Sequence, residues 1–385
     1  MFASRTAWKL TPNRLAAALE RHQQSGGKLL ALTASNPTTV GIQYDQAAIL
    51  SALSQEEALN YSPQAKGLRG ARQAVASYYD ARGDRPPDVE NIFLTASTSE
   101  GYSFVFRLLC EPGDEVLVPA PSYPLFDYLA SLQDVKPIHY QLFYDHGWHV
   151  DLHSLEKAVT PRTRAIVLVN PNNPTGSYVA DSAKQAINEF CLRQKLALIV
   201  DEVFLDYQRS GNKGRSFVEN REVLTFSLSG LSKIVALPQM KLAWIALSGP
   251  EEISREAAAR LEVIADTYLS VGTPVQVAAP ALLEQRKRVQ NQISDRVRHN
   301  LSALDAQIAR QSQCTRLELE GGWYAVLRVP VTKSDEEHAI ALLEQHSVLV
   351  HPGHFFDFHQ EGYLVVSLIT PREQFDPGIA KILAL

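Results

Sequence analysis

Cysteine is scarce in this chain of 385 residues, and long hydrophobic runs are missing. The three cysteines, Cys110, Cys191 and Cys314, lie far apart and form no CxxC pair, which fits buried, inert thiols in a reducing compartment. No apolar run approaches the roughly 18 residues that a membrane helix needs. The first residues also lack the apolar segment of a signal peptide. We therefore expect a cytoplasmic protein with no membrane partner.

Positive charge is in short supply as well. Lys and Arg number 37 against 42 Asp and Glu, a formal net charge of -5, so the composition does not favour nucleic acid as a partner. The chain has no GxGxxG and no P-loop lysine motif, which weighs against a dinucleotide or nucleotide site. His351, His354 and His359 flank Pro352-Gly353 and lack an acid or cysteine at ligand spacing, so we expect no metal site.

Short apolar runs alternate with helical patterns from about residue 92. This alternation predicts an α/β domain with a mostly parallel central sheet. After Pro274 the pattern changes to one long polar helix, expected at about residues 275–310, and then to hairpin, helix and strand patterns. We therefore expect a large domain of residues 40–274. Residues 1–39 and 275–385 are expected to form a smaller α+β domain.

One of the predicted strands, residues 165–169, ends in an unusual polar turn, Asn170-Pro-Asn-Asn-Pro-Thr-Gly176. Proline has no N–H for a strand ladder and pushes the residue before it out of the α region, so the turn should be stiff and extended. Asparagines held in this way can present amide groups to a ligand. An ordinary surface turn is the common alternative, and the turn alone does not decide between them.

Polar side chains follow several of the predicted strands. In open α/β sheets, ligands bind beyond the carboxyl ends of the strands, so these groups converge if the strands are neighbours. Hydroxyls at a helix N-terminus suit a phosphate, an acid can pair with a pyridinium nitrogen, and a lysine can form a Schiff base. This combination is what pyridoxal phosphate chemistry needs. The groups are Ser97-Thr98-Ser99, Ser122-Tyr123, Asn173, Asp201 and Ser232-Lys233.

Ordered motifs then point to a family. They are Asn-Pro-x-Asn-Pro-Thr-Gly at 170–176, Asp-Glu at 201–202, Ser-Lys at 232–233 with Leu-Pro at 237–238, Pro-Gly-Asp-Glu-Val-Leu-Val-Pro at 112–119, and Val-Leu-Val-x-Pro-Gly at 348–353. Each motif alone is weak, but all occur in the right order. The chain resembles the class I and II aminotransferases, of the fold type I pyridoxal-phosphate superfamily, over nearly its whole length.

The resemblance implies a role for each matching residue. Lys233 would form the Schiff base with pyridoxal 5'-phosphate, and Asp201 would pair with the ring nitrogen. Asn173 would bond the phenolic oxygen, and Tyr123 would stack on the ring. Tyr61 would reach the phosphate of a neighbouring subunit, which implies a homodimer with shared active sites. The remaining expected contacts are Ser97, Thr98, Ser99, Ser229 and Ser232 at the phosphate, and Asn36 with Asn173 at the substrate. For any single hydroxyl, an ordinary helix cap is the alternative.

The chain departs from the family pattern at three positions. Phe204 stands where a tyrosine usually bonds the phenolic oxygen. Lys241 stands where an arginine usually forks onto the phosphate, and lysine supplies charge without the fork. Val365 stands where an arginine usually holds the substrate α-carboxylate. Arg372, or an arginine of a partner chain, is a possible substitute.

The expected activity is a transaminase that moves an amino group between an amino acid, or a related amine, and a 2-oxo acid. The alternative is a lyase, decarboxylase or synthase with the same cofactor, because Val365 and Phe204 depart from the pattern and the scaffold hosts all these reactions. A third possibility is the ligand-sensing domain of a transcription regulator. It is disfavoured because too few residues precede Asn36-Pro37 for a DNA-binding module and the net charge is negative.

Overall fold

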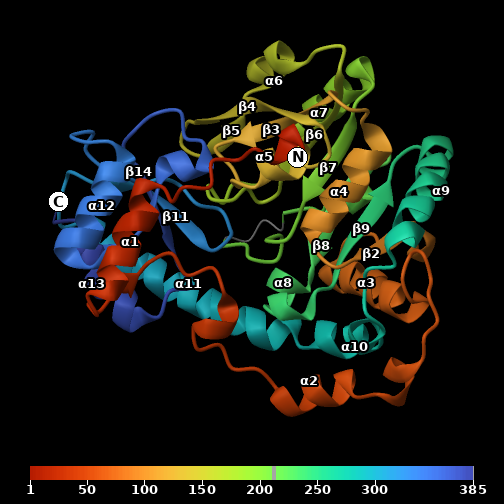
Figure 1. Ribbon diagram of the computed structural model, residues 1–385, viewed down its shortest axis with the longest axis horizontal. Helices are drawn as coiled ribbons and strands as arrows, with labels where there is room; N and C mark the ends of the chain where they lie inside the picture. Colours follow the sequence, from red (N-terminus) through yellow and green to blue (C-terminus); the bar gives the residue numbers. More distant parts are fainter. Residues whose placement is uncertain (210–213, 385) are drawn as a thin grey trace.

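The computed structural model describes residues 1–209 and 214–384 and places most strands in one large sheet (Figure 1). The strand order is β2-β9-β8-β7-β6-β3-β4-β5. Neighbours from β8 to β4 run parallel, whereas β9 and β5 run antiparallel to their neighbours. The α/β class with a mostly parallel sheet is therefore confirmed. The strands are β2 (Ile92–Thr95), β3 (Glu115–Ala120), β4 (Lys136–Tyr144), β5 (Trp148–Val150), β6 (Thr163–Val169), β7 (Ala197–Asp201), β8 (Thr225–Gly230) and β9 (Ala243–Ser248).

Strand β6 shows how helices cover both faces of the sheet. Successive side chains of a strand point to opposite faces, and both sets are buried here, so the strand is an unbroken apolar run. Ala165 and Val167 pack in a cluster with α4 (Thr98–Leu109), α5 (Phe126–Ser131) and α9 (Glu251–Tyr268). Ile166 and Leu168 pack on the other side with α6 (Leu152–Ala158) and α7 (Asp181–Gln194).

A further layer covers the β2 and β9 end of the sheet. It consists of α2 (Gln46–Leu53), α3 (Arg69–Arg82), α8 (Leu231–Ile234) and α10 (Thr273–Glu284). The single helix expected at 275–310 is wrong, because α10 ends at Glu284 and α11 (Arg286–Ile308) begins after Gln285. The Gln285 N–H donates to the Leu282 carbonyl at 3.1 Å, a tighter, 3-10-type bond that interrupts the α-helical ladder between them.

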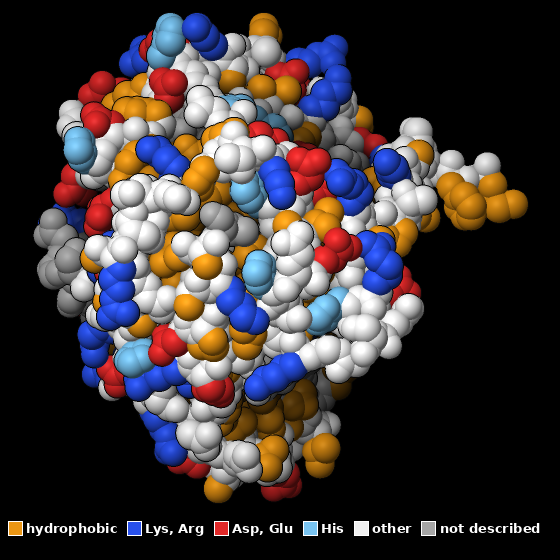
Figure 2. Space-filling model, turned by 90° about the vertical axis from the view of Figure 1, so that its left-hand side faces the viewer, with side chains coloured by type: hydrophobic (Ala, Val, Ile, Leu, Met, Phe, Trp, Pro, Cys, Tyr) orange, Lys and Arg blue, Asp and Glu red, His pale blue; other side chains and the backbone are white. Residues whose placement is uncertain are grey.

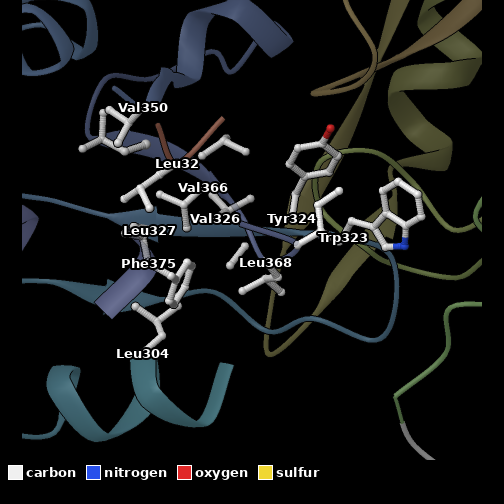
Figure 3. Packing of buried hydrophobic residues seen from close by; sticks show 14 of the residues in the cluster. Leu32, Leu304, Trp323, Tyr324, Val326, Leu327, Val350, Val366, Leu368 and Phe375 are labelled. Atoms are coloured by element: carbon white, nitrogen blue, oxygen red, sulfur yellow. The ribbon is translucent and has the colours of Figure 1, made fainter. Parts of the chain in front are cut away.

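The smaller sheet is antiparallel, with the order β10-β11-β14-β13. Its core gathers side chains from the N-terminal segment and the C-terminal third, as Figure 3 shows for Leu32, Leu304, Val366 and Phe375. Strand β1 (Leu30–Ala31) pairs in parallel with β12 (Val348–Leu349), so both ends of the chain share this core. The other elements are β10 (Thr315–Arg316), β11 (Tyr324–Arg328), β13 (His351–Pro352), β14 (Tyr363–Ser367), α1 (Arg14–Gln24), α12 (Asp335–His346) and α13 (Arg372–Ile382).

The two sheets meet where the 170–176 turn touches the hairpin between β10 and β11. Gly176 has φ +71°, and a Cβ at this position would lie 2.0 Å from Leu319 Cδ1 and 2.3 Å from the Gly321 carbonyl oxygen. Nearby, the Ser122 N–H donates to the Phe356 carbonyl at 2.9 Å. The small sheet and its loops thus lie against the edge of the large sheet where β3 and β6 end. Only glycine allows this approach at position 176.

Charged side chains of both signs share the face of the molecule formed by the small-sheet helices. Figure 2 shows the face that lies over α1, α12 and α13, and its basic and acidic side chains are interspersed without a patch of one sign. No helix within residues 1–209 and 214–384 is long and apolar enough to cross a membrane. In the same residues, no group of three His, Cys, Asp or Glu side chains is placed to hold a metal ion.

Candidate active site

The carboxyl ends of five strands meet at one edge of the large sheet. Strands β3, β6, β7 and β8 are parallel, and β2 points the same way because β9 runs antiparallel to both β2 and β8. The polar residues that follow these strands therefore lie at the same edge, as the sequence predicts. They are Ser97 after β2, Tyr123 after β3, Asn173 after β6, Asp201 at the end of β7 and Lys233 after β8.

Asp201 is the last residue of β7, and its carboxylate is held from two sides. Its Oδ1 accepts the Val203 N–H at 3.1 Å, and its Oδ2 accepts the Tyr102 hydroxyl at 3.3 Å. The adjacent Glu202 points elsewhere, because it accepts the Ser216 hydroxyl and the Phe217 N–H, each at 2.6 Å. The two acids of the Asp-Glu motif therefore have different roles. Asp201 lies at the edge where the strands end, and Glu202 anchors the loop that contains Ser216 and Phe217.

Lys233 lies in the one-turn helix α8, which directly follows β8. A Cβ at Gly230 would lie 2.8 Å from the Ala243 Cβ, so glycine is needed where β8 and β9 run close together just before the lysine. The Lys233 carbonyl accepts the Tyr207 hydroxyl at 2.6 Å, which fixes the backbone. The Lys233 Nζ lies 4.8 Å from the Trp323 ring centroid and 5.4 Å from that of Phe204.

Burial changes the acid-base properties of both residues. It raises the pKa of Asp201 to about 6, although the two hydrogen bonds and the nearby Lys233 charge favour the carboxylate. Burial lowers the pKa of Lys233 to about 8, although Asp201 opposes this effect. The result is a lysine that can lose its proton near neutral pH beside a buried acid. Such pairs are typical of catalytic sites.

The asparagines of the 170–176 turn have different environments. Asn170 accepts the Val179 N–H at 3.0 Å. Asn172 donates to the Pro121 carbonyl at 3.0 Å and accepts the Ser122 hydroxyl at 2.9 Å, which ties the turn to the loop after β3. In contrast, Asn173 Oδ1 is buried and has no hydrogen-bond partner among the described residues. The first two amides build the turn, and the Asn173 amide remains available to a ligand.

Three of the predicted phosphate contacts lie at the start of α4, and the others lie on or after β8. Ser97 caps this helix by accepting the Glu100 N–H at 3.1 Å, and Thr98 and Ser99 are its first two residues. A helix N-terminus of this length offers free N–H groups and a positive dipole end to an anion. Ser229 is buried, and its hydroxyl donates to the Glu202 carbonyl at 3.4 Å. Ser232 lies in α8, and Lys241 lies in the segment between α8 and β9. The Leu231 N–H donates to the Leu242 carbonyl, which ties the start of α8 to this segment.

Aromatic side chains line the rest of this region. Tyr123 is 38% exposed after β3, and both burial and the charge of Asp201 raise its pKa. Phe204 and Trp323 are buried with their ring centroids 5.2 Å apart and lie on the Lys233 side. Figure 3 shows Trp323 and Tyr324 at the end of the small-sheet cluster that lies nearest the strands of the large sheet.

Four other residues singled out in the sequence differ in burial and in hydrogen bonding. Tyr61 is 82% exposed, so within its own chain it is not buried in the site. Asn36 is exposed and uses its side-chain oxygen to accept the N–H and hydroxyl of Thr38, at 3.0 and 2.7 Å. Val365 is fully buried in β14, in register with Val326 and His351. Arg372, the candidate substitute for an arginine at 365, is exposed at the start of α13.

Sequence reasoning missed Tyr102 and Trp323. Tyr102 lies in an apolar helix pattern, where an aromatic residue usually belongs to the core. A signal for it was present, because Tyr102 is four residues after Thr98 and therefore on the same face of α4. Trp323 follows the Gly321-Gly322 hairpin, and its position beside Lys233 depends on contacts between distant segments. No local pattern in the sequence indicates such a contact.

The residues present fit pyridoxal 5'-phosphate. The donor set offers an amine with a lowered pKa, a buried carboxylate, a hydroxyl-rich helix N-terminus for a phosphate and a flanking aromatic ring. The unpartnered Asn173 oxygen is a further sign of a polar ligand, because a buried polar atom without a partner costs about 1–3 kcal/mol.

Comparison with known proteins agrees with this geometry. The profile of the family described as aminotransferase class I and II matches residues 27–382. A glutamate-pyruvate aminotransferase, AlaA, of Haemophilus influenzae is 27% identical over 369 residues, which are 94% of this chain and 91% of that protein. The AlaA protein of Escherichia coli K12 is 31% identical over 265 residues, 69% of this chain and 65% of that protein. The solved structure of an alanine aminotransferase from Pyrococcus furiosus shares the fold with a TM-score of 0.91 at 22% identity, covering 100% of this chain and 99% of that one.

Proposed function

The chain belongs to the class I and II aminotransferase family, and we propose that it transfers the amino group of glutamate to pyruvate with Lys233 as the lysine that holds the cofactor. Enzymes of this family depend on pyridoxal phosphate, and the chain is a transaminase. The choice of glutamate and pyruvate rests on the names of the two curated relatives. Both are aminotransferases, so the relatives favour amino transfer over the lyase, decarboxylase or synthase alternative.

The observation that carries the proposal is the buried pair of Lys233 and Asp201 at the ends of two adjacent strands. When bound, pyridoxal phosphate supplies a ring that accepts electrons from the α-carbon of the amino acid. Asp201 would receive the N–H of the ring nitrogen and keep that nitrogen charged. Lys233 has a pKa of about 8, so its Nζ can give up and take back a proton near neutral pH.

The other residues would hold and orient the cofactor. The N–H groups and hydroxyls of Thr98 and Ser99 would bind the phosphate, supported by Ser97, which caps the helix, and by Ser229, Ser232 and Lys241. Asn173 would turn its free amide to the ring plane. Tyr123 would cover one face of the ring, and Phe204 contributes packing only, because it has no hydroxyl to donate.

The substrate carboxylate needs a different partner from the one usual in the family. Val365 is buried and apolar, so position 365 offers no cation. Asn173 and Asn36 are the side-chain donors that we assign to the substrate. The Asn36 oxygen is occupied by Thr38, so Asn36 would contribute through its amide nitrogen. Amide donors supply less charge than an arginine, so we expect a higher KM for both acids than an arginine-containing relative would show.

The test is direct. Purified protein loaded with pyridoxal phosphate should form alanine and 2-oxoglutarate from glutamate and pyruvate, with 2-oxoglutarate and alanine rising in equal amounts. Borohydride reduction followed by peptide mapping should place the modification on Lys233. Label at another lysine would contradict the assignment of Lys233. Failure to form an aminated product with any of a broad panel of donors and acceptors would contradict the transaminase.

We also propose a homodimer with active sites shared between subunits, located in the cytoplasm and divided into domains at residues 40 and 274. Support for the dimer comes from three large apolar side chains in the segment before α3, Leu50, Leu59 and Tyr61, which are 64%, 88% and 82% exposed. Exposed apolar side chains close together in one segment favour an interface. Sedimentation should give about twice the chain mass of 42.7 kDa, and a monomer at micromolar concentration would contradict the dimer.

A further inference from the structure

Asp201 receives a hydrogen bond from Tyr102, a residue to which the family pattern gives no role. We propose that Tyr102 is a positioning residue for amino transfer, whose hydroxyl holds the Asp201 carboxylate in the orientation that receives the ring N–H of the cofactor. This inference rests on the proposed function, because it needs Asp201 to face the ring nitrogen. It adds a second element, α4, to the support of that contact.

The two donors on Asp201 determine how its carboxylate is turned. The Val203 N–H binds Oδ1 at 3.1 Å, and the Tyr102 hydroxyl binds Oδ2 at 3.3 Å, so each oxygen has one protein donor. A carboxylate oxygen has two acceptor sites, so one site on each oxygen stays open for a ligand donor. With both oxygens held, rotation about the Cβ–Cγ bond is restricted, and the open sites keep a fixed direction.

Tyr102 is itself rigidly held. Its side chain is only 2% exposed, and its ring packs against Phe106 and Phe126 with centroid distances of 5.9 and 5.5 Å. Burial and the nearby Asp201 charge raise the pKa of Tyr102 well above its usual value, so the hydroxyl keeps its proton and remains a donor at neutral pH. The phenol is therefore a fixed donor rather than a group that titrates with the substrate.

A purely structural reading is that a buried tyrosine hydroxyl simply needs an acceptor. The two readings differ in what happens when the hydroxyl is removed. If the hydrogen bond only pairs the buried Tyr102 hydroxyl with an acceptor, removal of the hydroxyl changes the stability of the protein and does not change its affinity for the ligand. If Tyr102 holds Asp201, its loss removes a donor that favours the ionised carboxylate, and burial then makes the acid easier to protonate. A protonated Asp201 no longer attracts a positively charged ring nitrogen.

Tyr102→Phe is the test, because it removes the hydroxyl and keeps the packed ring. The affinity of the cofactor-free protein is measured by absorbance titration with pyridoxal 5'-phosphate and with an analogue that has C–H in place of the ring nitrogen. We expect the variant to bind pyridoxal phosphate about tenfold more weakly than the wild type, the loss for one hydrogen bond to a charged group. Binding of the carbon analogue, which gives Asp201 nothing to pair with, should change by less than about twofold within the scatter of such measurements.

The pH dependence gives a second readout. The loss in the variant should grow as the pH falls from 8 to 6, because Asp201 would protonate at a higher pH without its phenol donor. Tyr79→Phe is the matched control. Tyr79 is fully buried and its hydroxyl accepts the Trp244 Nε1–H at 3.1 Å, away from Asp201, so this variant should bind both compounds like the wild type.

The inference is overturned if Tyr102→Phe binds pyridoxal phosphate as tightly as the wild type at every pH, or if both compounds lose affinity equally. These results differ from a failure of the proposed function. In that case the wild-type protein itself would not bind pyridoxal phosphate, or would bind both compounds with the same affinity.

Discussion

Lys233→Met is expected to lower the rate of amino transfer by at least about a thousandfold, because the variant loses both the amine that holds the cofactor and the group that moves the proton. Methionine is close to lysine in length and apolar, so it can lie against the rings of Phe204 and Trp323 without leaving a cavity. The measurement is alanine formation from glutamate and pyruvate. A variant with more than about a tenth of the wild-type rate would exclude Lys233 from the chemistry.

The same variant should change how stability depends on pH in the cofactor-free protein. The pKa of Lys233 is about 8 in the folded chain against 10.5 as the usual value. Between these pH values the unfolded chain holds the proton and the folded chain does not. The unfolded state therefore binds more protons, and the free energy of unfolding rises with pH. The rise attributable to Lys233 is about 3 kcal/mol between pH 8 and 10.5, and Lys233→Met should lack it.

The sign is opposite for Asp201. Its pKa is about 6 in the folded chain against 3.8, so the folded state binds more protons in this range and stability falls as the pH rises from 4 to 6. Urea titrations of wild type and variant across both ranges separate the two effects. Lys157→Met, at an exposed position on α6, is the control and should follow the wild type. Equal slopes for Lys233→Met and wild type above pH 8 would show that Lys233 is not desolvated.

Asp201→Asn is expected to reduce kcat/KM by about 100- to 1000-fold, the range for losing one preorganised electrostatic contact. The amide has the same shape, and its single oxygen can still accept the Val203 N–H, while its NH2 group would replace the oxygen that accepts the Tyr102 hydroxyl and would donate to that hydroxyl instead. It carries no charge, so it cannot keep the ring nitrogen protonated. The affinity for pyridoxal phosphate should fall as well. Rates within about threefold of wild type would show that Asp201 does not act on the ring.

Glu202→Gln is the matched control for this prediction. Glu202 is the next residue and is equally buried, with a pKa raised to about 7 by burial, but its hydrogen bonds go to Ser216 and Phe217. The exchange should weaken the anchoring of that loop by about 1–2 kcal/mol and leave kcat near the wild-type value. Asp201→Asn and Glu202→Gln each remove one buried carboxylate. If only Asp201→Asn lowers kcat/KM, the loss is due to the position of Asp201 and not to the removal of a buried charge in general.

The sequence predicts the large sheet well where its strands are buried on both faces. The predicted strand at residues 165–169 is apolar throughout, and it lies within β6, which spans Thr163–Val169. The convergence of the polar strand ends follows from parallel neighbours, so the pattern places Asp201 and Lys233 together without any knowledge of distances. These features depend on local pattern and on general sheet topology.

Other features depend on contacts that local pattern does not report. Strand β4 was not predicted because its side chains are mostly half-buried, with neither a continuous apolar run nor a clean alternation. The break between α10 and α11 at Gln285 has no proline or glycine to mark it. The environment of Val365 depends on its pairing with Val326 in β11 and His351 in β13, which are two separate strands. In the sequence Tyr102 cannot be told from an ordinary core aromatic residue, because its role depends on the packing of α4 against the end of β7.

Helix α4 carries residues that would contact both ends of the cofactor. Its first turn, with Thr98 and Ser99, would face the phosphate of the cofactor, and Tyr102 donates to Asp201, which would pair with the ring nitrogen. Four residues separate Thr98 from Tyr102, a rise of about 6 Å along a helix that packs as one rigid piece. If both residues act as proposed, the pitch of a single helix would set the spacing between the two ends of the ligand. A compound whose phosphate arm is one bond longer or shorter would then contact one end and not the other, so we expect the protein to bind such a compound more weakly than pyridoxal phosphate.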